Sequence, residues 1–358
     1  MPIAGAEDAR VAFVGDHPTV NEDLSGDAFS GESGAFVRDV VEDAGFDIET
    51  DVWSTFALIC HPHDKLKDAG KQITYCRPNI TNALSARKPR VVVAMGPMAL
   101  RSLIAPYWRS VGDMERWVGW RIPTPDGYWI CPTYSPSFAK HHKNDLIRKQ
   151  FAQHIETAMK IETRPAKPRD WKAEVEIIYD DIEAARALRD MHRAGGWVAI
   201  DYETNCLKPE YPEAEIISCA ASNGERTISY FWQGAAIKAT SKLLRSDRTM
   251  KIASNLKMEE RWTFKHLGHR VRNWGWDTML AAHCLDNRQG ICGLKFQSFV
   301  NLGAPSYNQT VEPYLRSSGW YNRIKKIHPQ DLLLYGGMDA LLEFELAMHQ
   351  RKEMGHED

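Results

Sequence analysis

The sequence predicts an α/β protein made of two domains. At 358 residues the chain is longer than a single hydrophobic core usually supports, so two compact domains are expected. Apolar runs of strand length alternate with helical patterns in both halves, and a charged, Pro-interrupted stretch at 162–170 separates the two series. We therefore expect a first domain at 1–161, a linker at 162–171 and a second domain at 172–358.

The first domain has the pattern of a parallel sheet. Its apolar runs are continuous rather than alternating, which is typical of strands covered on both faces. Helical spacing follows at 34–45, where Gly45 ends the helix, and at about 144–160. The runs that we expect to be strands are 11–15, 56–60, 91–96 and 128–134.

The second domain begins with a new alternating series. A strand at 175–179 precedes a helix at 181–192, and a second strand follows at 197–201. Two stretches with an antiparallel appearance come next, at 215–221 and 226–232. A further strand is expected at 251–255, helices fill most of the remainder, and the chain ends on a helical pattern.

Composition sets limits on the class of protein. A net charge of −2 neither predicts nor excludes nucleic acid, so any DNA contact must come from local basic patches. The 7 cysteines are scattered and odd in number, which suggests reduced core thiols in a cytosolic protein. The chain opens without a signal-peptide pattern and has no apolar run near the roughly 18 residues of a membrane span. We expect a cytoplasmic protein with no membrane partner.

Acidic residues recur in short segments of the second half, at intervals suited to binding metal ions. Asp201 and Glu203 stand at i and i+2 at the end of a strand and therefore share a face. Tyr335 and Asp339 stand at i and i+4 on an expected helix, and Glu259 follows the strand at 251–255. Such a carboxylate set suits two Mg²⁺ or Mn²⁺ ions, which activate water and stabilise charge during phosphodiester cleavage. The alternative is that these acids are solvated surface charges.

These segments resemble the 3′–5′ exonuclease domain of the DEDD superfamily, tyrosine subtype, as found in the proofreading domain of family A DNA polymerases. The resemblance covers about residues 172–355 and implies a ribonuclease H-like fold. It also implies that Tyr335 orients the attacking water. The implied metal ligands are Asp201, Glu203, Glu259 and Asp339, and the supporting residues are Asn255, Lys257 and Asp277.

Glu259 departs from the family pattern, which usually has aspartate at this position. Glutamate is one methylene longer, so its carboxylate is displaced by roughly 1–1.5 Å unless the backbone compensates. Mg²⁺ requires nearly ideal octahedral geometry, so the change could slow turnover or favour Mn²⁺. Glu260 is an alternative ligand if the register shifts by one residue, and an inactive exonuclease-like fold is the other alternative.

The segment at 14–36 is a Gly-punctuated loop that resembles the first motif of family 4 uracil-DNA glycosylases. The likeness continues through Cys60, 91–104 and 131–137, and it spans about residues 8–158. It implies an α/β/α sandwich. In that family, the acid at the position of Asp16 positions the attacking water, and the aromatic residue at the position of Phe29 stacks on a flipped base.

The sequence differs from this second family at the positions that carry out the family's chemistry. Phe56 stands where the family has a uracil-reading Asn, and Ser135 stands where it has a His that stabilises the departing uracil. Cys60 and Cys76 match only two of the four cysteines that hold its iron–sulfur cluster, so no cluster is expected. We therefore expect a catalytically degenerate domain, with uracil excision as an alternative.

A basic run after the 131–137 segment could retain DNA binding, with an apolar residue as a wedge. A solvated helix face is the alternative. The residues concerned are Phe138, Lys140, Lys143 and Arg148. A separate segment, Cys60-His61 with His63 and Asp64, resembles a metal site, but a structural turn explains this short Pro-containing loop better.

The order of the two domains resembles the N-terminal portion of family A DNA polymerases of some bacteriophages, so the cytoplasm of an infected host is the implied location. The expected activity is metal-dependent 3′–5′ DNA exonuclease action on single-stranded or frayed 3′ ends. The glycosylase-like domain would then bind DNA or dock on a polymerase subunit or domain. A silent module that only positions DNA or a polymerase is the alternative. A free-standing protein or a polymerase fragment, and DNA or RNA as substrate, stay open.

Overall fold

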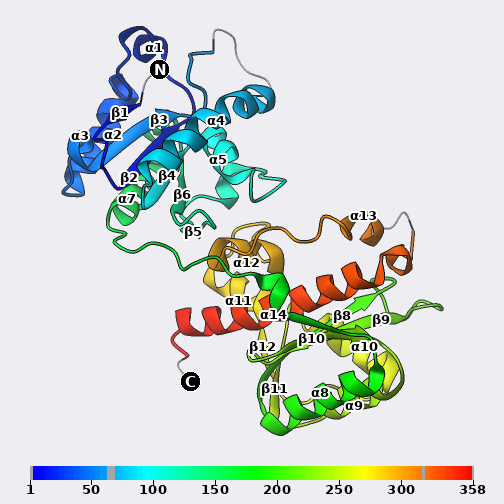
Figure 1. Cartoon of the computed structure of the whole chain (residues 1–358). Helices are drawn as coiled ribbons and strands as arrows, with labels where there is room; N and C mark the ends of the chain where they lie inside the picture. Colours follow the sequence, from blue (N-terminus) through cyan, green and yellow to red (C-terminus); the bar gives the residue numbers. More distant parts are fainter. Residues whose placement is uncertain (1–2, 63–68, 317–318, 357–358) are drawn as a thin grey trace. The chain divides into compact units, whose positions relative to one another are not determined.

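The computed structural model describes residues 3–62, 69–316 and 319–356. The chain forms two compact units, Met1–Pro168 and Arg169–Asp358, each with helices packed on a mixed sheet (Figure 1). The prediction of two α/β domains is therefore confirmed. None of the helices in the described ranges is long and apolar enough to cross a membrane.

The sheet of the N-terminal unit has the strand order β1-β3-β2-β4-β6-β5. Its four central strands are parallel, and β1 and β5 pair antiparallel at the edges. Every residue of β2, β3 and β4 is buried, which explains the continuous apolar runs. The strands are β1 (Ala4–Gly5), β2 (Val11–Gly15), β3 (Val52–Phe56), β4 (Val91–Met95), β5 (Ile122–Pro123) and β6 (Trp129–Thr133).

The strand predicted at 56–60 was wrong, because the strand is Val52–Phe56. Ser54 and Thr55 interrupt the apolar pattern of this segment, yet both are buried in the sheet. The strand pairs with β2 from Val11 opposite Val52 to Gly15 opposite Phe56, and Ala57 and Leu58 after it form a buried bend.

Helices α2, α5 and α7 pack against this sheet. Val37 of α2 and Phe151 of α7 pack in one core with strand residues such as Phe13 and Val93. Helix α1 lies inside the segment predicted as a loop and is stabilised by a capping box between Thr19 and Glu22. The helices are α1 (Val20–Ser25), α2 (Glu32–Asp43), α3 (Ile48–Asp51), α4 (Gly70–Arg87), α5 (Pro97–Ile104), η1 (Met114–Arg116), α6 (Pro136–His141) and α7 (Asp145–Met159).

The sheet of the C-terminal unit has the order β12-β11-β8-β9-β10-β7. Strands β12, β11 and β8 are parallel, β9 is antiparallel to both of its neighbours, and β7 is parallel to β10. The short strand β12 was not predicted. The strands are β7 (Val175–Ile178), β8 (Gly196–Thr204), β9 (Ile216–Ser222), β10 (Thr227–Phe231), β11 (Thr249–Ala253) and β12 (Trp274–Asp277).

The long helix α14 lies across one face of this sheet, and α8 and α9 cover the opposite face (Figure 1). Successive side chains of β8 point to opposite faces of the sheet. Tyr202 packs in the core on the side of α8 and α9, so Asp201 and Glu203 point to the side of α14. The helices are η2 (Trp171–Glu174), α8 (Asp181–Ala194), α9 (Gly234–Leu244), α10 (Lys257–Leu267), α11 (Thr278–Leu285), α12 (Leu294–Leu302), α13 (Glu312–Leu315), η3 (Ile324–Lys326) and α14 (Pro329–Glu353).

The cysteines are all free, but they are not all core residues as predicted. Cys60 and Cys284 are exposed, and Cys76 and Cys292 are partly buried. Cys76 lies within α4 and Cys284 near the end of α11, whereas Cys60 and Cys292 lie in loops, so none of the four belongs to a buried strand. The buried thiols are those of Cys131, Cys206 and Cys219.

Candidate metal centre

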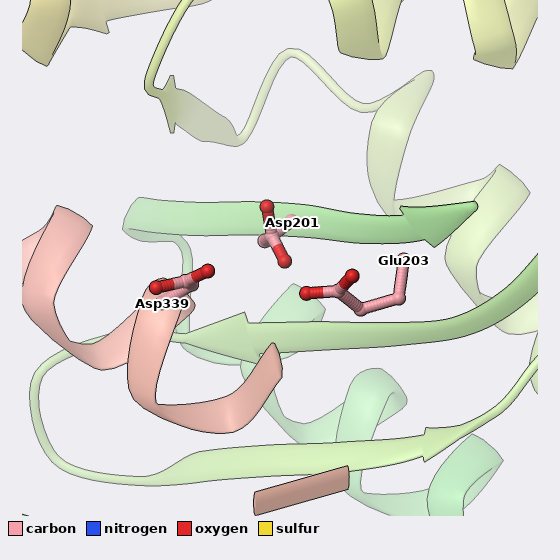
Figure 2. A group of neighbouring side chains, drawn as sticks. All are labelled: Asp201, Glu203 and Asp339. Atoms are coloured by element: carbon pink, nitrogen blue, oxygen red, sulfur yellow. The ribbon is translucent and has the colours of Figure 1, made fainter. Parts of the chain in front are cut away.

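Strand β8 and helix α14 bring three carboxylates together. Asp201 and Glu203 alternate with Tyr202 on β8, so both face α14. Asp339 lies one helical turn after Tyr335 and faces the strand. One carboxylate oxygen from each of the three acids lies within 4.8 Å of the others (Figure 2). This spacing suits a shared metal ion.

Two glycines allow α14 to lie this close to the sheet. A Cβ at Gly336 would lie 3.3 Å from Cγ of Glu203, and a Cβ at Gly337 would lie 2.3 Å from Cγ1 of Val175 on β7. Any side chain at Gly337 would therefore push the helix away from β7. The Gly-Gly pair places Tyr335 and Asp339 directly over the acids of β8.

Several carboxylate oxygens at this site are buried with no hydrogen-bond partner among the described residues: Asp201 Oδ2, Glu259 Oε2 and Glu343 Oε2. Burial and the charge of Asp339 raise the pKa of Asp201 to about 8. Burial and the charge of Asp201 raise the pKa values of Glu203, Glu259 and Glu343 as well. Several carboxylates lie close together here, and some of their oxygens are free to bind a ligand. Divalent cations such as Mg²⁺ prefer oxygen ligands of this kind.

Glu259 lies near the three acids but outside their group. It is buried in the first turn of α10, and the charge of Asp201 contributes to its raised pKa. The turn before α10 uses Asn255 with φ at 68°, a left-handed conformation that Asn tolerates. Asp277 fixes this turn by accepting from the backbone N–H groups of Asn255 and Leu256. Lys257 is exposed at the start of α10.

Glu260, which the sequence left open as an alternative ligand, is used elsewhere. Its Oε2 accepts from the backbone N–H of Val271 at 3.0 Å and from Nε1 of Trp274 at 3.2 Å. These bonds tie α10 to the segment before β12. In the structure, therefore, Glu259 and not Glu260 faces the acidic site.

The sequence did not point to Lys295, Tyr307 or Glu343. Nζ of Lys295 donates to the Tyr335 hydroxyl at 2.9 Å and to both oxygens of Asp339 at 3.1 Å. The hydroxyl of Tyr307 also donates to Asp339. Burial lowers the pKa of Lys295, but the charges of Asp339 and its neighbours outweigh this effect and raise it. Glu343 lies one turn beyond Asp339 and accepts from the backbone N–H of Ser254 at 3.1 Å.

Exposed apolar and aromatic side chains lie just beyond the end of β8. Trp320 is 62% exposed and stacks on Tyr211, with ring centroids 4.8 Å apart and an interplanar angle of 18°. Leu207, four residues before Tyr211 in the chain, is 79% exposed. Asn322 ties these loops to the strand, because its side chain donates to the carbonyl of Thr204 at 2.9 Å.

In the N-terminal unit, Phe56 ends β3 opposite Gly15, the residue before Asp16. Its ring stacks on Phe29 at 5.2 Å, and both residues are buried. The oxygen Oδ1 of Asp16 accepts from the backbone N–H groups of Met98 and Ala99, and burial raises the pKa of Asp16 to about 6. Ser135 caps α6 by accepting from the N–H of Phe138. The ring of Phe56 thus covers one face of the Phe29 ring.

The basic run lies on α6 and α7 and in the turn between them. Lys140 pairs with Glu32 at 2.6 Å, whereas Lys143 and Arg148 are exposed. Phe138 is 44% exposed and packs beside the rings of Tyr134 and His142. His63 and Asp64, which form part of the segment resembling a metal site, lie outside the described residues.

Comparison with known proteins assigns both units to families. Residues 2–160 match the uracil DNA glycosylase superfamily, and residues 175–354 match the 3′-5′ exonuclease family. The first part is 28% identical over 157 residues to a type-4 uracil-DNA glycosylase of Archaeoglobus fulgidus, covering 41% of this chain and 78% of that protein. The corresponding enzyme of Thermotoga maritima is 25% identical over 158 residues, covering 43% and 78%.

Among solved structures, Escherichia coli RNase D, an exoribonuclease, is similar with a TM-score of 0.40 and 14% identity, over 51% of this chain and 46% of that one. The chain thus spans less than half of that protein. The family matches confirm the order inferred from the sequence, in which a glycosylase-superfamily domain precedes an exonuclease domain.

Proposed function

The chain belongs to the 3′-5′ exonuclease family, and on this basis we propose that its C-terminal unit is a two-metal-dependent 3′–5′ DNA exonuclease of the proofreading type. The observation that carries the proposal is the group formed by Asp201, Glu203 and Asp339, with oxygens within 4.8 Å of one another. The buried oxygen of Asp201 without a hydrogen-bond partner in the described part of the chain supports it.

The acids have separate roles in this proposal. Asp201, Glu203 and Asp339 would hold one Mg²⁺ or Mn²⁺ ion, and Glu259 would join Asp201 at a second. Ions bound there would make the attacking water more acidic and stabilise charge on the leaving oxygen. The Tyr335 hydroxyl, which lies beside Asp339, would orient that water through a hydrogen bond.

The substrate would be a single-stranded or frayed 3′ end. Bases stack readily on exposed aromatic rings, and such stacking tolerates any sequence. Trp320 on Tyr211 offers a ring surface of this kind, and Leu207, four residues before Tyr211 in the chain, is an exposed apolar side chain. Because Asn322 anchors these loops to the end of β8, a strand that stacks there would enter next to the acids.

The N-terminal unit would serve as a platform that binds DNA or docks on a DNA polymerase subunit or domain. Uracil excision is disfavoured because Phe56 covers Phe29, and because a capping hydroxyl at Ser135 replaces an anion-stabilising group. Lys143, Arg148 and the partly exposed Phe138 would supply the DNA contacts.

A strand labelled at its 5′ end tests the exonuclease proposal. With Mg²⁺ or Mn²⁺ we expect progressive shortening that a blocked 3′ end prevents, and Asp201→Asn should abolish it. Asp247→Asn, at an exposed acid paired with Arg272, is the matched control and should retain activity. No shortening with either ion, in the natural chain or in Glu259→Asp, would favour the silent binding module. Abasic sites in uracil-containing DNA would instead revive the glycosylase alternative.

A further inference from the structure

Lys295 reaches from the first turn of α12 into the acidic site. Its ammonium nitrogen lies 3.1 Å from both carboxylate oxygens of Asp339 and 2.9 Å from the Tyr335 hydroxyl. The same nitrogen lies 4.7 Å from the ring centroid of Tyr335 and 5.3 Å from that of Tyr307. An ammonium between two ring faces and a carboxylate is held in one position.

These contacts use most of the ligand capacity of Asp339. A carboxylate oxygen has two lone pairs, and Oδ1 of Asp339 accepts from both Lys295 and Tyr307. The other oxygen, Oδ2, accepts from Lys295 as well. Asp339 is therefore surrounded by hydrogen-bond donors, whereas Oδ2 of Asp201 has no hydrogen-bond partner in the described ranges.

We propose that Lys295 is a positioning residue that acts as a resident cation: it holds Asp339 and Tyr335 in place in the metal-free protein and competes with a divalent ion for Asp339. The inference rests on the proposed function, since it assumes that Asp339 is a metal ligand. The lysine has room to withdraw, because its side chain is 27% exposed and its ammonium is readily hydrated at the surface.

The competition has a direct consequence for metal affinity. An ion that binds Asp339 must replace the charge-assisted hydrogen bonds that Lys295 donates to it. Lys295→Met keeps the length of the side chain but removes the charge, so the variant should bind Mn²⁺ about ten- to a hundredfold more tightly than the natural chain. Lys295→Arg should bind Mn²⁺ no more tightly than the natural chain, because a guanidinium can hold both oxygens of Asp339.

Calorimetric titration of the full chain with Mn²⁺ alone measures these affinities without any activity assay. Thermal unfolding in EDTA checks that each variant is folded, and Lys295→Gln takes the place of Lys295→Met if the latter does not fold. Lys238→Met is the matched control, since Lys238 is an exposed lysine on α9, and its Mn²⁺ affinity should equal that of the natural chain.

The possible outcomes separate this inference from the proposed function. Tighter Mn²⁺ binding in Lys295→Met but not in Lys295→Arg supports the competition. Equal or weaker binding in Lys295→Met, or tighter binding in Lys295→Arg, overturns the role of Lys295 and leaves the metal site standing. An absence of Mn²⁺ binding in every variant overturns both.

Discussion

The backbone N–H of Asn255 donates a hydrogen bond of 3.1 Å to Oδ1 of Asp277. The same oxygen accepts from Met279 and Leu280 at the start of α11, and Oδ2 accepts from Leu256 before α10. One carboxylate therefore begins one helix and fixes the turn before another. Since Glu259 lies in the first turn of α10, its approach to Asp201 depends on Asp277.

Asp277→Ala should destabilise the protein more than removal of an ordinary helix cap. The substitution leaves four backbone donors without their acceptor, so we expect the free energy of unfolding to fall by about 2–3 kcal/mol. Asp180 caps α8 by accepting from the backbone N–H of Glu183, so Asp180→Ala serves as the comparison and should lower the free energy of unfolding by about 1 kcal/mol. Urea unfolding measures both, and equal losses would show that the link to Asn255 contributes nothing.

Gly337→Ala should separate α14 from the sheet. The added methyl group would lie 2.3 Å from Cγ1 of Val175, an overlap that neighbouring groups must relieve at a cost of about 1–3 kcal/mol. Val175→Ala removes the overlapping methyl groups, so the Gly337 substitution should cost less in that background. A double-mutant cycle of unfolding free energies measures the coupling. Simple additivity of the two substitutions would contradict the packing described for this helix.

The metal-free protein should lose stability as the pH rises. The folded-state pKa of Asp201 is about 8, against an ordinary value of 3.8, so the folded state holds this proton more tightly than the unfolded state. The resulting stabilisation is present below the ordinary pKa and is lost as the pH rises from about 4 to about 8. Thermal midpoints in EDTA should therefore fall across this window less steeply for Asp201→Asn than for the natural chain. Added Mn²⁺ should reduce this loss of thermal stability with pH. If the thermal midpoints of both chains fell equally steeply with pH, the raised pKa of Asp201 would be refuted.

Trp320→Ala should weaken binding of single-stranded DNA. Stacking of one base on an aromatic ring contributes about 1–3 kcal/mol, which corresponds to a loss of about five- to over a hundredfold in affinity. Fluorescence anisotropy with a short labelled strand in EDTA measures the change without cleavage. Trp120→Ala, at a partly buried tryptophan of the N-terminal unit whose Nε1 donates to Arg116, is the matched control and should bind as the natural chain does. Unchanged affinity in Trp320→Ala would exclude this ring from the binding surface.

Local patterns in the sequence predicted the framework of the site well. The strand that carries Asp201 and the helix that carries Asp339 both follow from periodicity, which depends on neighbouring residues alone. Glu343 was missed although the spacing was informative, since it repeats the interval of four residues between Tyr335 and Asp339. Strand β12 has only four residues with a central glycine and therefore gave no strand pattern.

Other features arise only from tertiary contacts. Lys295 is an ordinary helix residue in the sequence, and its role follows from the packing of α12 beside α14. Phe56 in place of the family's Asn predicts a loss of base recognition, but its stacking on Phe29 is a tertiary contact that no local pattern indicates. The position of Glu259 outside the group of three acids likewise depends on the turn at Asn255, which no periodicity describes.

The central claim is that the acids of β8 and α14 hold divalent ions for phosphodiester cleavage. A crystal soaked in Mn²⁺, with anomalous scattering used to locate the ions, tests it most directly. We predict one ion among Asp201, Glu203 and Asp339, a second near Asp201 and Glu259, and withdrawal of the Lys295 ammonium from Asp339. Crystals with no anomalous signal between β8 and α14, at a Mn²⁺ concentration that supports binding elsewhere on the surface, would contradict the account.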